Sequence, residues 1–357
     1  MSTTDTLTIN KILNTVAERQ ATDVHFVVGN YPFLRIKGEL ETLSQEELIT
    51  PETMEGIISF FVTEDKLPLI KEKKEIKFVF DWLNKARFRV HIFQQKGYFS
   101  VSLKLIGLDI KSFAELNLPK VIETFAQTEK GLLFITGPFN SGRSTTLVSI
   151  LQEINRTRKE HILYLEEVNE QLFVNEQSII EQRQVGTDVE SFTAGLLSAK
   201  DEDVNIVAVS EVPNTESLEI LLELAESGRL VIALLDYASA TSALDGLVSK
   251  FDDAKIAWAR NVLADFLVGI VVQRLVPTVD GEMILAVEVL TPSPSAKALI
   301  KEGRFTQLDS IIQTSRSEGM ISLDRSLLDL VQKGKISPET AVANAIDPKV
   351  LKPLLRL

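Results

Sequence analysis

The chain has 357 residues, 45% of them hydrophobic, and this length is sufficient for two domains that each bury a sizeable core. It contains no cysteine, which excludes disulfides and cysteine metal sites, and its three histidines lack the spacing of metal ligands. A formal net charge of −12 argues against a broad nucleic-acid-binding surface, so no nucleic-acid partner is expected. No apolar run reaches the roughly 20 residues that cross a bilayer, and the first residues lack a secretory signal, so we expect a cytoplasmic protein that is not membrane-embedded.

The first part of the chain is predicted to form an α+β domain over residues 1–111. Apolar residues recur at helical spacing over residues 9–20, and residues 51–62 read as a second helix with Pro51 in its first turn. Short runs with strand character follow at residues 24–28, 33–36, 76–80, 88–93 and 98–105. Residues 112–130 are expected to link this domain to the next.

From Gly131 onwards strands and helices alternate, which is typical of an α/β fold with a parallel sheet covered on both faces. Strands are expected at residues 132–135, 162–165, 206–209 and 230–235, with helices at residues 144–157, 191–200 and 215–227. A longer helix at 254–275 is expected before a last strand at 283–290. Short amphipathic helices follow Pro294, so we predict a core at residues 131–291 and a C-terminal helical region at residues 292–357.

Residues 131–147 read GLLFITGPFNSGRSTTL, an apolar strand that leads into a glycine-bounded loop and then a helix. This is the layout of a phosphate-binding P-loop, in which backbone N–H groups and a helix N-terminus bind the anion. The motif requires a lysine where this chain has Arg143, whose planar fork is bulkier and presents its donors differently. Ser144 supplies the hydroxyl expected to touch Mg²⁺; the alternative is an ordinary strand–turn–helix connection. The residues expected to bind the nucleotide here are Gly137, Asn140, Ser141, Gly142, Arg143, Ser144 and Thr145.

Acidic residues follow two of the predicted strands. Glu166 and Glu167 come after residues 162–165, and Glu211 follows residues 206–209. Ligands of open α/β sheets lie at the carboxyl ends of the strands, so these carboxylates are candidates for catalysis. Glu166 and Glu211 could each hold Mg²⁺ through water or orient the attacking water, while the alternative is that they are simply solvated charges.

Basic residues gather on the later strands of the first domain, at Lys85, Arg87, Arg89 and Lys104. Strand alternation places Arg87 and Arg89 on the same face of their sheet. They could reach the phosphate of a nucleotide held by a neighbouring domain or subunit, as arginine fingers do. The alternative is a solvated sheet face.

Together these segments resemble the PilT-type ATPases, the hexameric motors that retract type IV pili, within the secretion ATPase superfamily. The resemblance covers nearly the whole chain, and its motifs occur in the order of the family. They are ATDVH at residues 21–25, RFRVHIF at 87–93, GLLFITGP at 131–138, INRTRKEHIL at 154–163, LEEV at 165–168, QRQVGTD at 182–188, ESGRLV at 226–231, QRLVP at 273–277 and AKALIKEGR at 296–304.

The resemblance implies a PAS-like N-terminal domain, a RecA-like core and a small C-terminal helical domain, with ATP and Mg²⁺ held between subunits of a hexameric ring. Arg143 then stands at the P-loop lysine, Glu166 and Glu167 at the acidic box, and Glu211 at the Walker B glutamate. Arg87 and Arg89 match the strand arginines of the family. The implied partners are further copies of this chain or an active paralogue in a mixed ring, together with an inner-membrane pilus platform protein that would place the chain at the membrane periphery.

Several departures from the family pattern involve residues of its chemistry. Arg143 replaces the P-loop lysine, Arg229 and Asp236 replace the two histidines of the histidine box, and Ser210 replaces the glycine before the Walker B glutamate. Asn205 stands where an aspartate is common. We expect these changes to lie around one site and to leave a nucleotide-binding protein whose ATP hydrolysis is weak or lost, a pseudoenzyme. The alternative is a fully active hexameric ATPase that powers pilus retraction and twitching motility.

Overall fold

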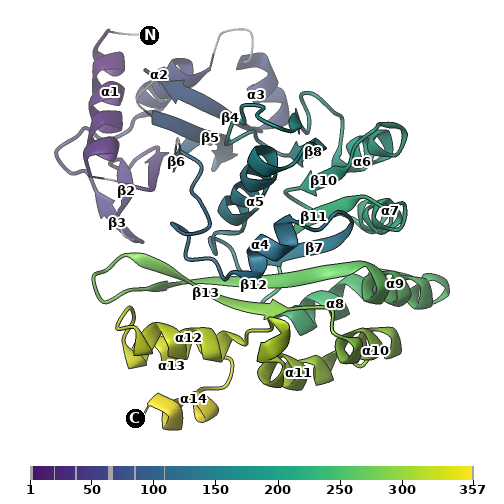
Figure 1. The fold of residues 1–357 in the computed structure, drawn as a ribbon. Coiled ribbons are helices and arrows are strands. Elements are labelled where there is room, and N and C mark those ends of the chain that lie inside the picture. The colour runs from purple at the N-terminus through teal and green to yellow at the C-terminus, as the bar shows by residue number, and fades with distance from the viewer. Residues whose placement is uncertain are drawn as a thin grey trace. The chain divides into compact units, whose positions relative to one another are not determined.

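The computed structural model describes residues 3–19, 21–36, 38–62, 67–83, 86–107 and 109–355, and its chain divides into two compact units. The first unit comprises Met1–Asp109 and the short segment Val168–Leu172, and the second comprises Ile110–Glu167 and Phe173–Leu357 (Figure 1). In the part of the chain that the structure describes, no helix is both long enough and apolar enough to cross a membrane.

The first unit is built on a six-stranded antiparallel sheet in the order β3-β2-β1-β6-β5-β4. Its strands are β1 (Asp23–Val27), β2 (Phe33–Ile36), β3 (Glu39–Thr42), β4 (Glu75–Trp82), β5 (Ala86–Gln95) and β6 (Tyr98–Ile106). Its helices are α1 (Thr3–Glu18), α2 (Pro51–Phe61) and α3 (Leu67–Lys73). Apolar side chains of α1 and α2 form one core with the alternate strand residues Phe26, Phe88 and Leu103, so these helices cover one face of the sheet.

The second unit contains a seven-stranded sheet in the order β13-β12-β7-β11-β10-β8-β9, parallel except for β13. Its strands are β7 (Gly131–Thr136), β8 (His161–Glu166), β9 (Ile179–Gln184), β10 (Ile206–Val209), β11 (Leu230–Leu235), β12 (Leu267–Pro277) and β13 (Met283–Leu290). Every residue of β7, β10 and β11 is buried, as expected for central strands with helices on both faces. This is a mixed α/β fold with two sheets and a RecA-like core.

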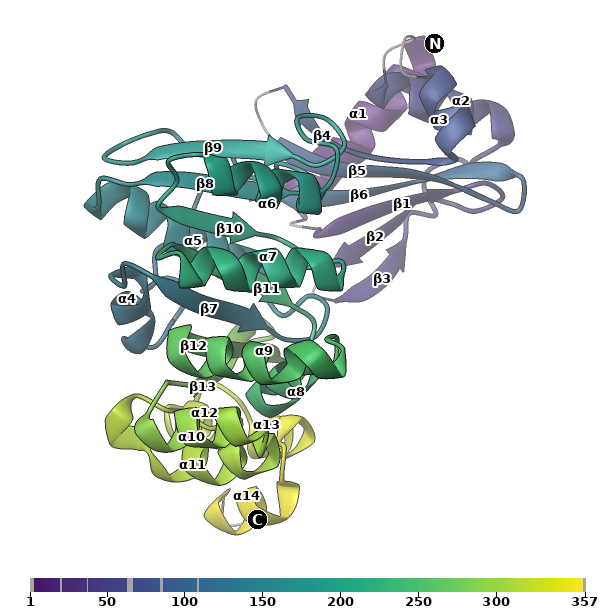
Figure 2. The same cartoon turned by 90° about the vertical axis from the view of Figure 1, so that its right-hand side faces the viewer.

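Helices divide between the two faces of this sheet. The helices are α4 (Val121–Ala126), α5 (Arg143–Thr157), α6 (Phe192–Asp201), α7 (Thr215–Glu226), α8 (Ala240–Val248) and α9 (Asp253–Phe266). The core under α4 and α5 takes Leu133 and Ile135 from β7, whereas the core under α6 to α9 takes Leu132 and Phe134 from the same strand. Figure 2 shows α6, α7 and α9 side by side over the second of these faces. The helix α4 lies in the segment 112–130, where a linker is expected.

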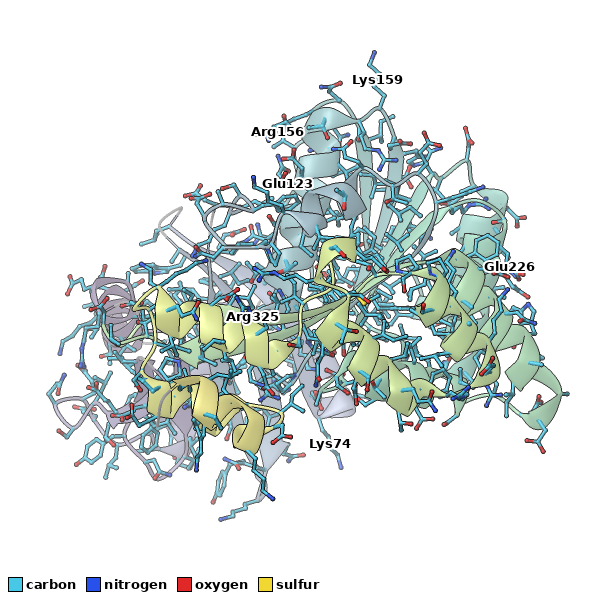
Figure 3. All side chains as sticks on the ribbon, turned by 60° about the horizontal axis from the view of Figure 1, so that its bottom comes forward. Lys74, Glu123, Arg156, Lys159, Glu226 and Arg325 are labelled. Atoms are coloured by element: carbon cyan, nitrogen blue, oxygen red, sulfur yellow. The ribbon has the colours of Figure 1, made fainter. Side chains whose placement is uncertain are left out.

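The chain ends in short helices, as the sequence predicts after Pro294. They are α10 (Pro294–Glu302), α11 (Leu308–Thr314), α12 (Leu323–Gln332), α13 (Pro338–Asn344) and α14 (Pro348–Leu355), with 3₁₀ turns at Phe305–Gln307 and Arg316–Glu318. The last three helices share a small core with Val276 and Ala286 of β12 and β13. Arg325 of α12, labelled in Figure 3, pairs with Asp329 of the same helix at 3.0 Å.

One predicted element is wrong. The apolar pattern predicts a helix over residues 254–275, but α9 ends at Phe266 and β12 begins at Leu267. Residues 267–273 are buried on both faces because β12 lies between β7 and β13, so their apolar run carries no alternation that could distinguish a strand from a buried helix. Val268, Ile270 and Val271 are β-branched, and this composition favours the strand.

Glu288 of β13 is a buried carboxylate that holds the start of α8. Its Oε1 accepts a hydrogen bond of 2.8 Å from the Ala240 N–H, and the residue is 3% exposed. Burial is the main cause that raises the pKa of Glu288 to about 7, and the carboxylates of Asp309 and Asp324 add to this rise while the Ala240 hydrogen bond and Arg274 oppose it.

We expect Glu288→Gln to become more stabilising, relative to the unchanged protein, as the pH rises. The folded-state pKa lies above the unfolded value of 4.5, so this group stabilises the fold below pH 4.5 and loses that contribution as pH rises through about 7. Between these two pH values the contribution of Glu288 to the free energy of unfolding changes by about 3 kcal/mol. The glutamine keeps an oxygen for Ala240 and does not ionise. The melting temperatures of the unchanged protein and of Glu288→Gln at pH 5.5 and 8.5 measure this change. A difference between the two proteins that is the same at both pH values would contradict the prediction.

Candidate functional site

The loop between β7 and α5 has the backbone conformation of a phosphate cradle. Gly137 has a φ of 151°, and a Cβ at this position would lie 2.3 Å from the Gln273 carbonyl oxygen and 2.6 Å from Ser141 Oγ. Gly142, which caps α5, has a φ of 87°, and Asn140 between them has a φ of 61°. The first glycine is therefore required by space and by backbone conformation, and the second by conformation alone.

The N-terminus of α5 receives no hydrogen bond from a capping side chain, because its N-cap is Gly142. Its first N–H groups have no partner within the helix and carry the positive end of its dipole. The short helices α4 and α11 also begin without a capping side chain, but seven other helices of the second unit have one, from Ser191, Asn214, Ser239, Asp252, Ser293, Ser322 and Ser337. The start of α5 is thus suited to an anion that takes the place of a cap.

Three side chains of this segment have hydroxyl groups that suit a phosphate. Ser141 is 2% exposed, and its Oγ has no hydrogen-bond partner among the described residues. Ser144 and Thr145 are exposed on the first turn of α5, where a nucleotide or its metal ion can reach them. The backbone cradle and these hydroxyl groups therefore fit a nucleotide phosphate.

Arg143 points to the end of β11. Its Nη1 donates a hydrogen bond to the Leu235 carbonyl oxygen and forms an ion pair with the Asp236 carboxylate. The Arg143 side chain is 16% exposed, whereas that of Asp236 is 79% exposed. The cation of this loop thus already has a carboxylate partner from the chain itself.

The segment after β11 is held in place on both sides of Asp236. Leu235 lies opposite Thr136 in the parallel pairing of β11 with β7. Thr136 Oγ1 donates to the Tyr237 carbonyl oxygen at 2.9 Å and accepts from the Tyr237 N–H at 2.8 Å. Burial, assisted by the charge of Asp236, raises the pKa of the Tyr237 hydroxyl. Asp236 therefore has a fixed backbone position.

The acidic residues lie at the same edge of the sheet as the loop. Glu166 ends β8, is 4% exposed, and accepts a hydrogen bond of 3.2 Å from Gln182 Nε2. Glu167 is half-buried, and Glu211 is exposed after β10. Because β11 and β10 separate β7 from β8, Glu166 is about 14 Å from β7 across the sheet, and Glu211 is about 10 Å from it.

Two of the departures noted in the sequence lie at the opposite edge. Asn205 precedes β10, and its Oδ1 accepts from the His161 N–H at 2.9 Å. Arg229 precedes β11 and donates to Ser227 Oγ at 2.7 Å. Because β7, β10 and β11 are parallel, the residues before these strands lie away from the loop that follows β7. The expectation that all departures surround one site is therefore wrong, while Arg143 and Asp236 do meet.

Arg87 and Arg89 lie on one face of β5, as alternation predicts, and both contact the segment Val168–Leu172 within the first unit. Arg87 Nη2 donates to the Asn169 carbonyl oxygen at 3.2 Å, and Arg89 pairs with Glu170 at 3.0 Å. Lys104 is exposed opposite Arg89. Lys85 lies outside the described residues.

Two contacts of the site join residues that lie far apart in the sequence and are not visible there. Gln273 of β12 is fully buried and donates to Thr146 Oγ1 at 2.6 Å, which ties the first turns of α5 to the strand beside β7. The partnership of Arg143 with Asp236 joins residues 93 positions apart. Among the described residues, no group of three histidine or acidic side chains could hold a metal ion by itself. A metal here would depend on phosphate oxygens and water for most of its ligands.

Comparisons with known proteins agree with this geometry. A family model described as "Type II/IV secretion system protein" matches residues 5–333. The chain is 31% identical to the type IV pilus retraction ATPase PilT of Pseudomonas aeruginosa over 341 residues. This alignment covers 96% of this chain and 99% of that protein. It is 28% identical over 348 residues to the type IV pilus ATPase PilU of the same organism, covering 97% and 91%. A crystal structure of the pilus retraction motor PilT with bound ADP superposes with a TM-score of 0.84 and 32% identity, covering 96% of this chain and 98% of that one.

We expect Gly137→Ala to destabilise the second unit by about 3 kcal/mol, because the methyl group would meet a backbone carbonyl in addition to its unfavourable φ. The control is Gly228→Ala, where φ is 97° and the added methyl group meets nothing within 4 Å. That variant should lose about 1 kcal/mol from φ alone. Thermal melting of both variants measures the difference, and equal losses would show that position 137 is not sterically closed.

Proposed function

This chain belongs to the type II/IV secretion system protein family, and we propose that it is a nucleotide-binding member of the PilT/PilU-like type IV pilus motor group. The observation that carries this proposal is the cradle at Gly137, which only glycine can occupy and which leads into the uncapped N-terminus of α5. The PilT motor that superposes on this chain was crystallised with ADP, and its likeness supports the same ligand class here.

The ligand is ATP with Mg²⁺. The backbone of residues 137–145 would hold the β-phosphate, with Asn140, Ser141 and Thr145 lining the loop, and Ser144 would offer its hydroxyl to the metal. Bound Mg²⁺ supplies positive charge to the β- and γ-phosphates. Glu166, which ends β8 at the carboxyl edge of the sheet, would hold the metal through water. Glu211 is the carboxylate that would orient the attacking water.

Hydrolysis is weak or lost in this proposal. Phosphoryl transfer depends on positive charge positioned at the transferring phosphate, and Arg143 instead donates to Leu235 and pairs with Asp236. One observation favours the alternative of a fully active ATPase that powers retraction. Ser144 and Glu211 are both present at the carboxyl edge of the sheet and both exposed.

We expect the purified chain to bind Mg-ATP with little steady-state hydrolysis, and Arg143→Lys to raise the rate at least tenfold by restoring a compact cation. Glu211→Ala in the Arg143→Lys background should remove that gain. The measurement is phosphate release at saturating Mg-ATP. Turnover by the unchanged chain at 1–10³ s⁻¹, an ordinary enzyme rate, would establish the active alternative.

The chain assembles into a ring, with a nucleotide held between subunits and with either identical copies or an active paralogue as neighbours. Arg87 and Arg89, which lie on one face of β5, would serve that interface. The ring would work in the cytoplasm against an inner-membrane pilus platform protein.

We expect sedimentation velocity to show an oligomer of about six chains in the presence of Mg-ATP, and Arg87→Ala with Arg89→Ala to shift it towards smaller species. The exposed Lys74 provides the control, as Lys74→Ala removes a cation of the same unit outside this cluster. A monomer under all conditions would contradict homomeric assembly.

A further inference from the structure

Asp236 and Arg143 are two unusual residues that the fold brings into one ion pair. We propose that Asp236 is a positioning residue that holds the Arg143 guanidinium at the end of β11, so that the phosphates of a bound nucleotide must compete with this carboxylate for it. The proposal rests on the proposed nucleotide site and assigns to Asp236 the control of its affinity.

The backbone position of Asp236 is set by its neighbours in the sequence. Leu235 is fixed by its pairing with Thr136, and Tyr237 is fixed by two hydrogen bonds to the same threonine. The Tyr237 ring packs against Gly246 of α8 so closely that a Cβ there would lie 2.3 Å from the ring. Asp236 therefore stands between two anchored residues beside the first turn of α5, within reach of Arg143.

Arg143 has two acceptors at this place, since the Leu235 carbonyl oxygen lies beside the Asp236 carboxylate. The planar guanidinium can donate to both, which an ammonium group on a lysine stem does less well. Arginine at this position is thus well matched to an aspartate after β11. The pair explains why Arg143 points along the sheet edge towards β11.

The exposure of the Asp236 side chain determines the strength of its ion pair with Arg143. Asp236 is 79% exposed, so water and salt screen the attraction, and exposed pairs are weak. A nucleotide with several negative charges can therefore displace the carboxylate. Asp236 lowers the affinity of the site for a nucleotide in two ways. The Arg143 guanidinium must first leave the Asp236 carboxylate, and the negative charge of that carboxylate, then unpaired, repels the phosphates.

The test is the equilibrium binding of a fluorescent ATP analogue with Mg²⁺ to the full chain, which does not depend on turnover. We expect Asp236→Asn to bind roughly tenfold more tightly than the unchanged protein, with a smaller gain at high salt. Asp201, an exposed aspartate that ends α6 at the other edge of the sheet, provides the control. Asp201→Asn should bind within twofold of the unchanged protein.

A double-mutant cycle separates positioning from simple repulsion. In the background Arg143→Ala, the change Asp236→Asn should improve binding by about twofold only, because no guanidinium remains to be released. An equal gain in both backgrounds, or no gain in Asp236→Asn alone, would overturn the inference while leaving the nucleotide site intact. Failure of every variant to bind the analogue would overturn the site and the inference together.

Discussion

The parallel pairing of β7 with β11 is the constraint on which the rest of the site depends. It places Thr136 opposite Leu235, so that the loop after β7 and the segment after β11 begin side by side at one edge of the sheet. The two hydrogen bonds between Thr136 and Tyr237 then fix the second segment against the first. The phosphate cradle, the start of α5 and Asp236 all take their positions from this pair of strands.

The same constraint changes how the unusual residues of the chain are understood. In the sequence, Arg143 and Asp236 are predicted to be two separate departures from the family pattern. In the structure they form one ion pair with a shared carbonyl acceptor, so they act as a single alteration of the site. Arg229 and Asn205, in contrast, bind backbone and side-chain groups at the other edge of the sheet and have a local structural role there.

The sequence predicted most of the fold because its elements have distinct local patterns. The strands at residues 206–209 and 230–235 have the predicted bounds, since each is a short apolar run next to a predicted helix at residues 215–227. The helix expected at 254–275 failed where the apolar run became buried on both faces. The candidate phosphate loop was visible because its sequence pattern is local, within residues 137–145. The partners of Arg143, Thr136 and Gln273 were not visible, because each is more than 90 residues away and arises from strand order alone.

The central claim is that the loop at Gly137 holds nucleotide phosphate and that Asp236 competes for its cation. An experimental structure of the chain with Mg-ADP tests this most directly. We expect the β-phosphate on the backbone of residues 137–145, with the Arg143 guanidinium turned from Asp236 towards it. Arg143 still bound to Leu235 and Asp236 beside an occupied loop, or ADP bound elsewhere, would contradict the claim.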